Sequence, residues 1–287
     1  MKRAWIAVRS ALLWAASALH FFPISSLFVL LGIFLPPQRF DRLLRGFFRN
    51  VLRVAGAKIE VQFAPGFDPA RTCLFFANHV NIFDPFVLYA AIPQFVRGVE
   101  LESHFKIPGY GWMAKRFGNI PVPDKASSAT GLRRMVRQMK EALDGGTSLV
   151  VFPEGGRTRD GYVREFRGGV FRIAQQLGYP VVPISIVGSY EFHRTGSWLL
   201  HPGKITVHIH EPIETKHLRK EEALSAVVER VHAAAASRES RREDAEAFRR
   251  RVREVVAAPV HAALEARRGE RPAQLPARAP QKTGPVP

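Results

Sequence analysis

The hydrophobic pattern of the chain begins with a long apolar stretch near the N-terminus. Residues 11–35 carry no charge apart from a possible one on His20, and basic residues flank both ends. About 20 apolar residues suffice to cross a bilayer. Pro23 interrupts the stretch, and Ser25 and Ser26 follow it, which predicts a hairpin of two short helices entering one leaflet. A single-span anchor is the alternative. The length of the stretch and the lack of a small-residue cleavage site disfavour a signal peptide.

Short apolar runs in the central part of the chain have the form of buried strands. They lie at residues 72–77, 148–152, 179–188 and 204–209, with further strands expected at 58–63, 95–100 and 118–125. Apolar residues at helical spacing predict helices between them, at 40–54, 85–91, 131–143 and 171–177. The pattern predicts an α/β fold, in which helices cover a mixed β-sheet.

A loop at residues 78–84 joins the buried strand at 72–77 to a helix that opens with Pro85. It carries His79 and Asp84, at the carboxyl end of a strand, where open α/β sheets place their chemistry. On a regular helix a separation of five residues would place the two side chains about 140° apart, so they could not share a face. In a turn, however, the carboxylate can fold back toward the imidazole. Such a pair can accept a proton from an alcohol. Otherwise Asp84 is only a helix cap and His79 only a polar loop residue.

A second loop, at residues 153–161, follows another buried strand and is rich in glycine and arginine. Glycines let backbone N–H groups approach an anion, and Arg157 and Arg159 supply paired donors suited to phosphate. A solvated turn is the alternative. The position at the end of a strand favours a binding site.

The net charge of the chain indicates more about its partners than its composition does. With 42 Lys and Arg against 25 Asp and Glu, the net charge is +17. This excess indicates a polyanionic partner, either nucleic acid, an anionic membrane surface or a phosphorylated substrate. The single cysteine, Cys73, excludes a disulfide framework and a cysteine metal site, and fits a reducing, cytoplasmic environment.

Four blocks, taken in order, resemble those of the glycerolipid acyltransferases, specifically the 1-acyl-glycerol-3-phosphate acyltransferase (PlsC-type) family. Residues 78–84 carry a histidine, four residues and an aspartate, and residues 152–157 read Phe-Pro-Glu-Gly-Gly-Arg. Residues 118–122 and 182–184 are similar to the second and fourth blocks of that family. The resemblance covers roughly residues 60–210.

The resemblance implies a role for each matching residue. His79 is the general base, and Asp84 orients it. The acceptor hydroxyl then attacks the thioester of acyl-CoA or acyl carrier protein, a co-substrate, with no metal and no other cofactor. Glu154 and Gly155 shape the acceptor site, and Arg157 binds the acceptor phosphate or stabilises the site. We add Asn78 as a candidate donor to the developing oxyanion.

Two departures from the family pattern concern the acceptor. The arginine that usually closes the second block is replaced by Pro123-Asp124-Lys125, so Lys125 is the candidate phosphate ligand there. The lysine-rich stretch before Phe105 is also altered. The expected acceptor is lysophosphatidate, giving phosphatidic acid for phospholipid biosynthesis. A lyso-ornithine lipid or another lysophospholipid is the alternative.

Three other classes of protein are alternatives to an acyltransferase. A nucleic-acid-binding protein would explain the charge, but the chain has no basic–aromatic platform. A serine hydrolase would need a Gly-x-Ser-x-Gly elbow, for which Gly188-Ser189 is a poor substitute. A non-catalytic lipid-binding protein of the same fold is the remaining alternative.

The expected organisation has four parts. They are a membrane-associated helical hairpin or anchor at 1–50, an acyltransferase domain at 51–215, charged helices at 216–270 and a disordered Pro/Ala-rich tail at 271–287. We expect the catalytic domain on the cytoplasmic side of the inner membrane. The expected partners are acyl-CoA or acyl carrier protein, a lysophospholipid and membrane lipid, and not nucleic acid.

Overall fold

The computed structural model describes residues 2–107, 110–124, 129–214, 250 and 252–266. Its centre is a seven-stranded sheet in the order β1-β7-β6-β2-β5-β3-β4. Strands β6 and β7 pair antiparallel, and the other neighbouring strands pair in parallel. The predicted mixed sheet is confirmed. The strands are β1 Ala57–Phe63, β2 Leu74–Ala77, β3 Val96–Leu101, β4 Ile120–Val122, β5 Ser148–Val151, β6 Val181–Val187 and β7 Gly203–Ile209.

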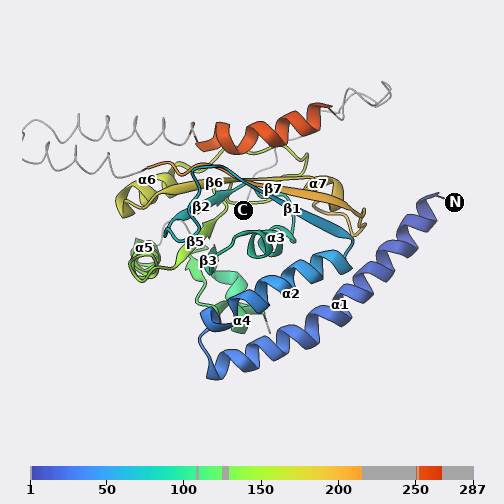
Figure 1. Ribbon diagram of the computed structural model, residues 1–287, viewed down its shortest axis with the longest axis horizontal. Helices are drawn as coiled ribbons and strands as arrows, with labels where there is room; N and C mark the ends of the chain where they lie inside the picture. Colours follow the sequence, from blue (N-terminus) through green and yellow to red (C-terminus); the bar gives the residue numbers. More distant parts are fainter. Residues whose placement is uncertain (1, 108–109, 125–128, 215–249, 251, 267–287) are drawn as a thin grey trace, which may run out of the picture.

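Helices cover both faces of the sheet (Figure 1). One face carries α1, α2 and α3, and the other carries α5, α6 and a helical segment at 252–266. The helices are α1 Lys2–Phe34, α2 Asp41–Val54, α3 Asp84–Ala91, α4 Tyr110–Arg116, α5 Ala129–Asp144, α6 Gly168–Leu177 and α7 Ser189–Phe192, with short 3-10 turns at Pro37–Phe40 and Glu102–Lys106.

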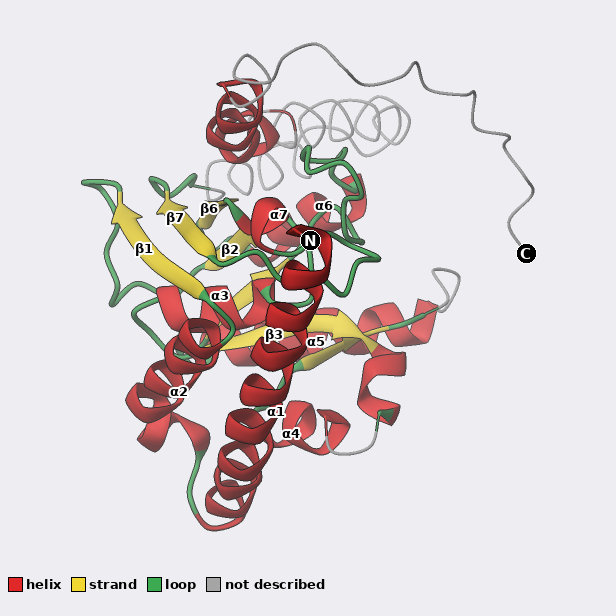
Figure 2. Ribbon diagram, turned by 90° about the vertical axis from the view of Figure 1, so that its right-hand side faces the viewer, coloured by secondary structure: helices red, strands yellow, loops and turns green. Residues whose placement is uncertain are grey.

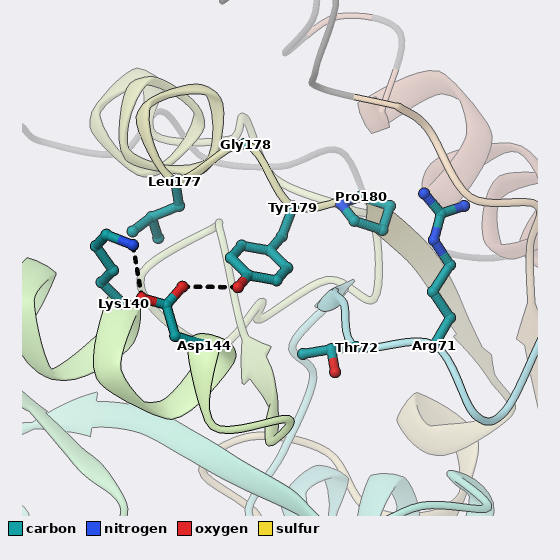
Figure 3. A pocket seen from close by; sticks show the side chains of 8 residues that line it. All are labelled: Arg71, Thr72, Lys140, Asp144, Leu177, Gly178, Tyr179 and Pro180. Carbon is teal, nitrogen blue, oxygen red and sulfur yellow. Dashed lines mark hydrogen bonds and ion pairs between the residues drawn. The ribbon is translucent and has the colours of Figure 1, made fainter.

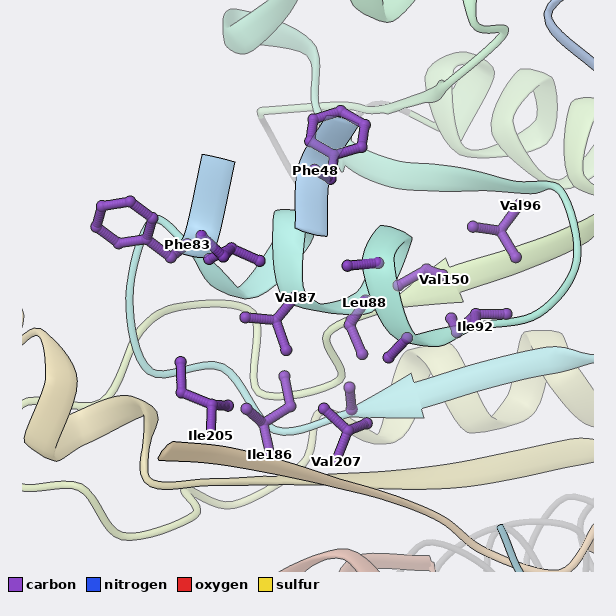
Figure 4. Close-up of a cluster of buried hydrophobic side chains, with 14 of the residues drawn as sticks. Phe48, Phe83, Val87, Leu88, Ile92, Val96, Val150, Ile186, Ile205 and Val207 are labelled. Carbon is purple, nitrogen blue, oxygen red and sulfur yellow. The ribbon is translucent and has the colours of Figure 1, made fainter. Parts of the chain in front are cut away.

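Strand β2 has buried side chains on both faces, as its continuous apolar sequence predicts. Phe75 packs into the cluster beneath α2 and α3, whereas Leu74 and Phe76 pack into the cluster beneath α5 and α6. Figure 4 shows the first cluster, in which side chains of α3 meet those of β6 and β7. Strand β2 is therefore held in the middle of the core, and the loop that follows it starts from a rigid position.

Three parallel neighbours, β5, β2 and β6, end at the same edge of the sheet. The loops that leave this edge begin at residues 78, 152 and 188. Carboxyl ends of neighbouring parallel strands are the common position of sites in α/β sheets. The arrangement brings together loops that lie more than a hundred positions apart along the chain.

The predicted break at Pro23 is wrong, because α1 continues through it from Lys2 to Phe34. The hydroxyls of Ser25 and Ser26 donate to the carbonyl of Phe22, at 3.1 and 2.8 Å, so both serines bond to the helix backbone. The predicted hairpin of two short helices within residues 11–35 is therefore absent, and the chain bends instead at residues 35–40, where α2 returns along α1.

Helix α1 runs along the outside of the molecule from α7 to α4 (Figures 1 and 2). It is long and apolar enough to cross a membrane by length and composition. Its inner face packs on the core, through residues that include Trp14, Phe21 and Phe28. Its outer face exposes Trp5, Val8, Leu12, Leu19, Phe22, Leu27, Leu30, Ile33 and Phe34.

The C-terminal predictions fall mostly outside the described residues. The predicted helices at 216–270 are described at 250 and 252–266, where the chain is helical, and the tail at 271–287 is not described. Residues 252–266 pack against the second cluster through Val252, Val256 and Val260.

Gly188, between β6 and α7, tests how tightly this edge of the sheet is built. Its φ is +90°, and a Cβ added there would overlap the carbonyl oxygen of Lys204 on β7. Gly146 has a φ of +77° but nothing within 4 Å of the added Cβ, so Gly146→Ala is the matched control. We expect Gly146→Ala to lower the free energy of unfolding by about 1 kcal/mol. Gly188→Ala should lower it by about 1–3 kcal/mol more. Equal losses in chemical denaturation would contradict the close approach.

Candidate active site

The loop after β2 brings His79 and Asp84 together. His79 Nδ1 lies 2.9 Å from Oδ2 of Asp84. The same carboxylate oxygen accepts hydrogen bonds from the backbone N–H groups of Val80 and Asn81, at 2.5 and 2.8 Å. Asp84 is the first residue of α3, and Phe83 occupies the N-cap position. The carboxylate therefore folds back onto the loop and orients His79, and it does not act as a helix cap.

The imidazole is held with one nitrogen turned away from Asp84. His79 stacks on the ring of Phe152 from β5's loop, with centroids 4.0 Å apart. An ionised carboxylate can only accept hydrogen bonds, so Nδ1 carries a proton, and in the neutral imidazole the lone pair lies on Nε2. Within the described residues, Nε2 has no hydrogen-bond partner, and the side chain is 18% exposed. The dyad thus presents an accessible base above a fully buried carboxylate.

Glu154 supports the backbone of the dyad from the second loop. Its Oε1 accepts the N–H of His79 at 2.8 Å, and its Oε2 accepts the N–H of Arg164 at 2.9 Å. The side chain is buried, and burial raises its pKa to about 7, with a smaller contribution from the charge of Asp84. With both oxygens occupied by backbone donors, Glu154 fixes the shape of the site and does not face a substrate.

Asn78 does not lie where the oxyanion prediction requires. Its Nδ2 donates to the carbonyl of Ile186 at 3.1 Å, and its Oδ1 accepts the N–H of Ile186 at 2.7 Å. Only 1% of Asn78 is exposed. The side chain extends the pairing between β2 and β6, and its burial leaves it almost no surface for contact with a substrate. We therefore withdraw Asn78 as the oxyanion donor.

The loop that carries the predicted arginines is hydrogen-bonded directly to the backbone of His79. The N–H of Thr158 donates to the carbonyl of His79 at 3.0 Å. Arg157 and Arg159, on either side of it, are exposed, and their guanidinium groups make no hydrogen bond or ion pair with the part of the chain that is described. Gly155, with φ of +64°, leaves room for the guanidinium of Arg167, which donates to the Gly155 carbonyl at 3.3 Å. The predicted Lys125 lies outside the described residues.

Two buried residues that sequence reasoning missed complete the surroundings of Asp84. The hydroxyl of Ser189 donates to Asp84 Oδ1 at 2.6 Å. Asn81 Nδ2 lies 2.9 Å from Ser189 Oγ, and Asn81 Oδ1 accepts the N–H of Phe83. The available signal was the position of Ser189, immediately after the strand at 179–188, at the same edge of the sheet as His79.

Helix α1 contacts the same region. The ring of Trp14 lies 5.4 Å from that of Phe83 and 6.0 Å from that of His193, and its Nε1 donates to the carbonyl of Trp198 at 2.7 Å. His193 is buried, and burial lowers its pKa, with a smaller contribution from the positive charge of Arg157. The N-terminal helix is thus part of the wall of the site.

A cavity on the opposite edge of the sheet contains none of these residues (Figure 3). Its two cations are both paired, Lys140 with Asp144 at 2.6 Å and Arg71 with Glu214 at 2.5 Å. Tyr179 donates to Asp144 at 2.7 Å. Its polar groups are therefore satisfied within the protein. The lining residues are Arg71, Thr72, Lys140, Asp144, Leu177, Gly178, Tyr179 and Pro180.

The search for metal and thiol sites concerns only the residues that the structure describes. Among these, no three or more His, Cys, Asp or Glu side chains are grouped so as to hold a metal ion. Cys73 is buried, and burial raises the pKa of its thiol to about 12, so it stays protonated at neutral pH.

Comparison with known proteins assigns a class to this arrangement. Residues 58–187 match the family model described as Acyltransferase. A solved structure, the 1-acyl-sn-glycerophosphate (LPA) acyltransferase PlsC from Thermotoga maritima, has the same fold, with a TM-score of 0.68 and 24% identity. The match covers 93% of this chain and 98% of that chain. Residues 58–187 are therefore similar in sequence to the acyltransferase family, and the chain shares the fold of that solved structure.

Curated relatives narrow the resemblance to the PlsC-type glycerolipid acyltransferases, as the sequence predicts. The 1-acyl-sn-glycerol-3-phosphate acyltransferase BAT2 of Brassica napus is 31% identical over 185 residues, which cover 61% of this chain and 52% of that protein. The Pseudomonas aeruginosa enzyme of the same printed name is 27% identical over 154 residues, 54% of this chain and 58% of that protein. The chain spans about half the length of the curated relatives it matches.

The buried Glu154 predicts a pH dependence of stability. A carboxyl whose pKa is raised from 4.5 to about 7 binds more protons in the folded state across that interval. Its contribution is complete below about pH 4.5 and is lost as the pH rises toward 7, so the free energy of unfolding falls. Glu154→Gln removes this titration, and the difference between variant and wild type should change by about 3 kcal/mol across the interval. Parallel stability curves in chemical denaturation would contradict it.

Proposed function

We propose that the chain is an O-acyltransferase that moves a fatty acyl group from a thioester to the free hydroxyl of a lysolipid. The observation that supports this most directly is the 2.9 Å contact between His79 Nδ1 and the buried Asp84, with Nε2 accessible. The acyl donor is acyl-CoA or acyl carrier protein. The acceptor is 1-acyl-sn-glycerol-3-phosphate, the substrate that the names of the curated relatives state for those proteins.

The proposed mechanism uses the dyad as a base and then as an acid. Nε2 of His79 takes the proton of the acceptor hydroxyl as its oxygen attacks the thioester carbonyl carbon. Asp84 stabilises the imidazolium that forms. Collapse of the tetrahedral intermediate breaks the carbon–sulfur bond, and the leaving thiolate takes the proton from Nε2. No acyl group is bound covalently to the protein at any step.

Two exposed arginines support a phosphate in the acceptor. Arg157 and Arg159 make no ion pair with any described residue, and the intervening Thr158 is bonded to His79. A guanidinium can bind phosphate through two parallel hydrogen bonds. The phosphate of lysophosphatidate, bound here, would leave the glycerol hydroxyl free to reach Nε2. Lys125 is a further candidate ligand from the second block.

The N-terminal hairpin supports association with a membrane surface. The inner face of α1 packs on the protein through Trp14, Phe21 and Phe28, and its outer face exposes a row of apolar side chains. A helix surrounded by lipid on all sides would have to lose the inner contacts, so α1 fits the plane of the membrane surface better than a free span. We propose attachment to the cytoplasmic face of the inner membrane, where the net charge of +17 favours anionic lipid.

Replacing the proposed base tests the function directly. We expect His79→Ala to lower the rate of acyl transfer to lysophosphatidate by about 10³-fold, the scale of losing a general base. His208→Ala is the control, because that imidazole lies on β7 and stacks on His210, outside the two loops that carry His79 and Arg157. The measurement is thioester-dependent transfer to a panel of lysolipids by purified protein in detergent. Equal activity in both variants would favour a non-catalytic lipid-binding protein.

The acceptor phosphate is tested at Arg157. We expect Arg157→Ala to raise KM for lysophosphatidate by about tenfold, and to change KM for a lyso-ornithine lipid far less. Arg172→Ala, an exposed arginine on α6, is the matched control for the loss of charge. Transfer to the lyso-ornithine lipid alone would move the assignment to that acceptor. Equal effects of Arg157→Ala on both acceptors would remove Arg157 as the phosphate ligand.

A further inference from the structure

The two oxygens of the Asp84 carboxylate are supported very differently. Oδ2 accepts three hydrogen bonds, from His79 Nδ1 and from the N–H groups of Val80 and Asn81. Oδ1 accepts one among the described residues, from the hydroxyl of Ser189. Asp84 has no surface exposed to bulk solvent. The charge on Oδ1 therefore depends on one side chain, contributed by a different part of the chain.

The direction of the Ser189 hydroxyl is fixed by its neighbours. Asn81 Nδ2 lies 2.9 Å from Ser189 Oγ, 2.8 Å from the Ser189 carbonyl and 2.9 Å from the His193 carbonyl, so its two hydrogens are shared among these three acceptors. Because the amide supplies hydrogen to Oγ, the hydroxyl proton is free to point at Oδ1, which can only accept. Asn81 and Ser189 thus form a relay that delivers a hydrogen bond to the carboxylate.

Backbone structure holds this relay in position. Strand β6 ends at Val187, and Gly188, with φ of +90°, turns the chain so that Ser189 begins α7. Ser189 and Asn81 have no exposed surface, so neither touches a substrate. Any effect of these residues on chemistry must act through Asp84.

We propose that Ser189, oriented by Asn81, is a positioning residue that shares the negative charge of the Asp84 carboxylate and keeps the carboxylate directed at His79. This inference rests on the proposed function of His79 as a base. Without the hydroxyl, the carboxylate holds more of its negative charge toward Nδ1 and binds the imidazolium more tightly. His79 then remains protonated to higher pH and is lost as a base at neutral pH.

The other titratable and charged groups near Asp84 come from three elements. His79 lies on its own loop, Glu154 lies on the loop after β5, and His193 follows α7. Arg157 lies near enough to influence His193. None of these is altered by a change at Ser189, so a shift in the pH profile reports the missing hydroxyl.

Ser189→Thr and Ser189→Val form the matched pair for the test. Both add the same bulk, and only threonine keeps the hydroxyl. We expect Ser189→Val to lower kcat/KM at neutral pH by about tenfold and to move the acidic limb of the pH–rate profile about one pH unit upward. At pH values above the limb, its rate should recover toward that of Ser189→Thr. Ser189→Ala serves as a second variant without the hydroxyl if Ser189→Val does not fold.

A second readout separates this inference from the proposed function. The ¹³C resonance of the His79 ring, assigned by its loss in His79→Ala, should titrate at higher pH in Ser189→Val than in Ser189→Thr. This comparison holds even if no acyl transfer is found, in which case only the proposed function fails. Superimposable titrations of the two variants would overturn the inference. A loss of rate in Ser189→Val that is equal at every pH would also overturn it.

Discussion

The Asp84 carboxylate has no contact with solvent, so its charge depends on the donors that surround it. Those donors come from two backbone N–H groups, an imidazole and the hydroxyl of Ser189. For the carboxylate to receive all of these hydrogen bonds, the loop after β2 and the start of α7 must both lie within hydrogen-bond distance of this side chain at the start of α3. The edge of the parallel strands makes this possible. The local structure of the site is therefore arranged so that one buried carboxylate receives its hydrogen bonds.

The loop that follows β5 is organised around the dyad in the same way. Glu154 binds the backbone of His79, and Thr158 binds its carbonyl from the other side. A residue that the family resemblance assigns to the acceptor site therefore acts as a brace, whereas the exposed arginines beside it remain available to a ligand. The division follows burial: the carboxylate is enclosed, and the guanidinium groups are at the surface.

The sequence predicts most of the fold, because strands buried on both faces are continuous apolar runs and the loops after them are distinct. It also predicts the pairing of His79 with Asp84, because the two residues lie five positions apart in the loop that follows one strand. It does not predict the hydrogen bonds of Asn78 with Ile186 or of Ser189 with Asp84, because these partners lie 108 and 105 positions apart. The continuity of α1 through Pro23 was also missed, since tertiary packing along the inner face outweighs the local cost of proline.

The contact of Trp14 with Phe83 and His193 makes the N-terminal helix a structural component of the reaction centre. In the proposed function, membrane attachment and chemistry therefore share this contact, and a chain shortened to remove α1 would lose the packing of Trp14 on Phe83 and His193. A substitution at Trp14 that adapts the helix to a different bilayer would also change the packing of the residue that precedes Asp84.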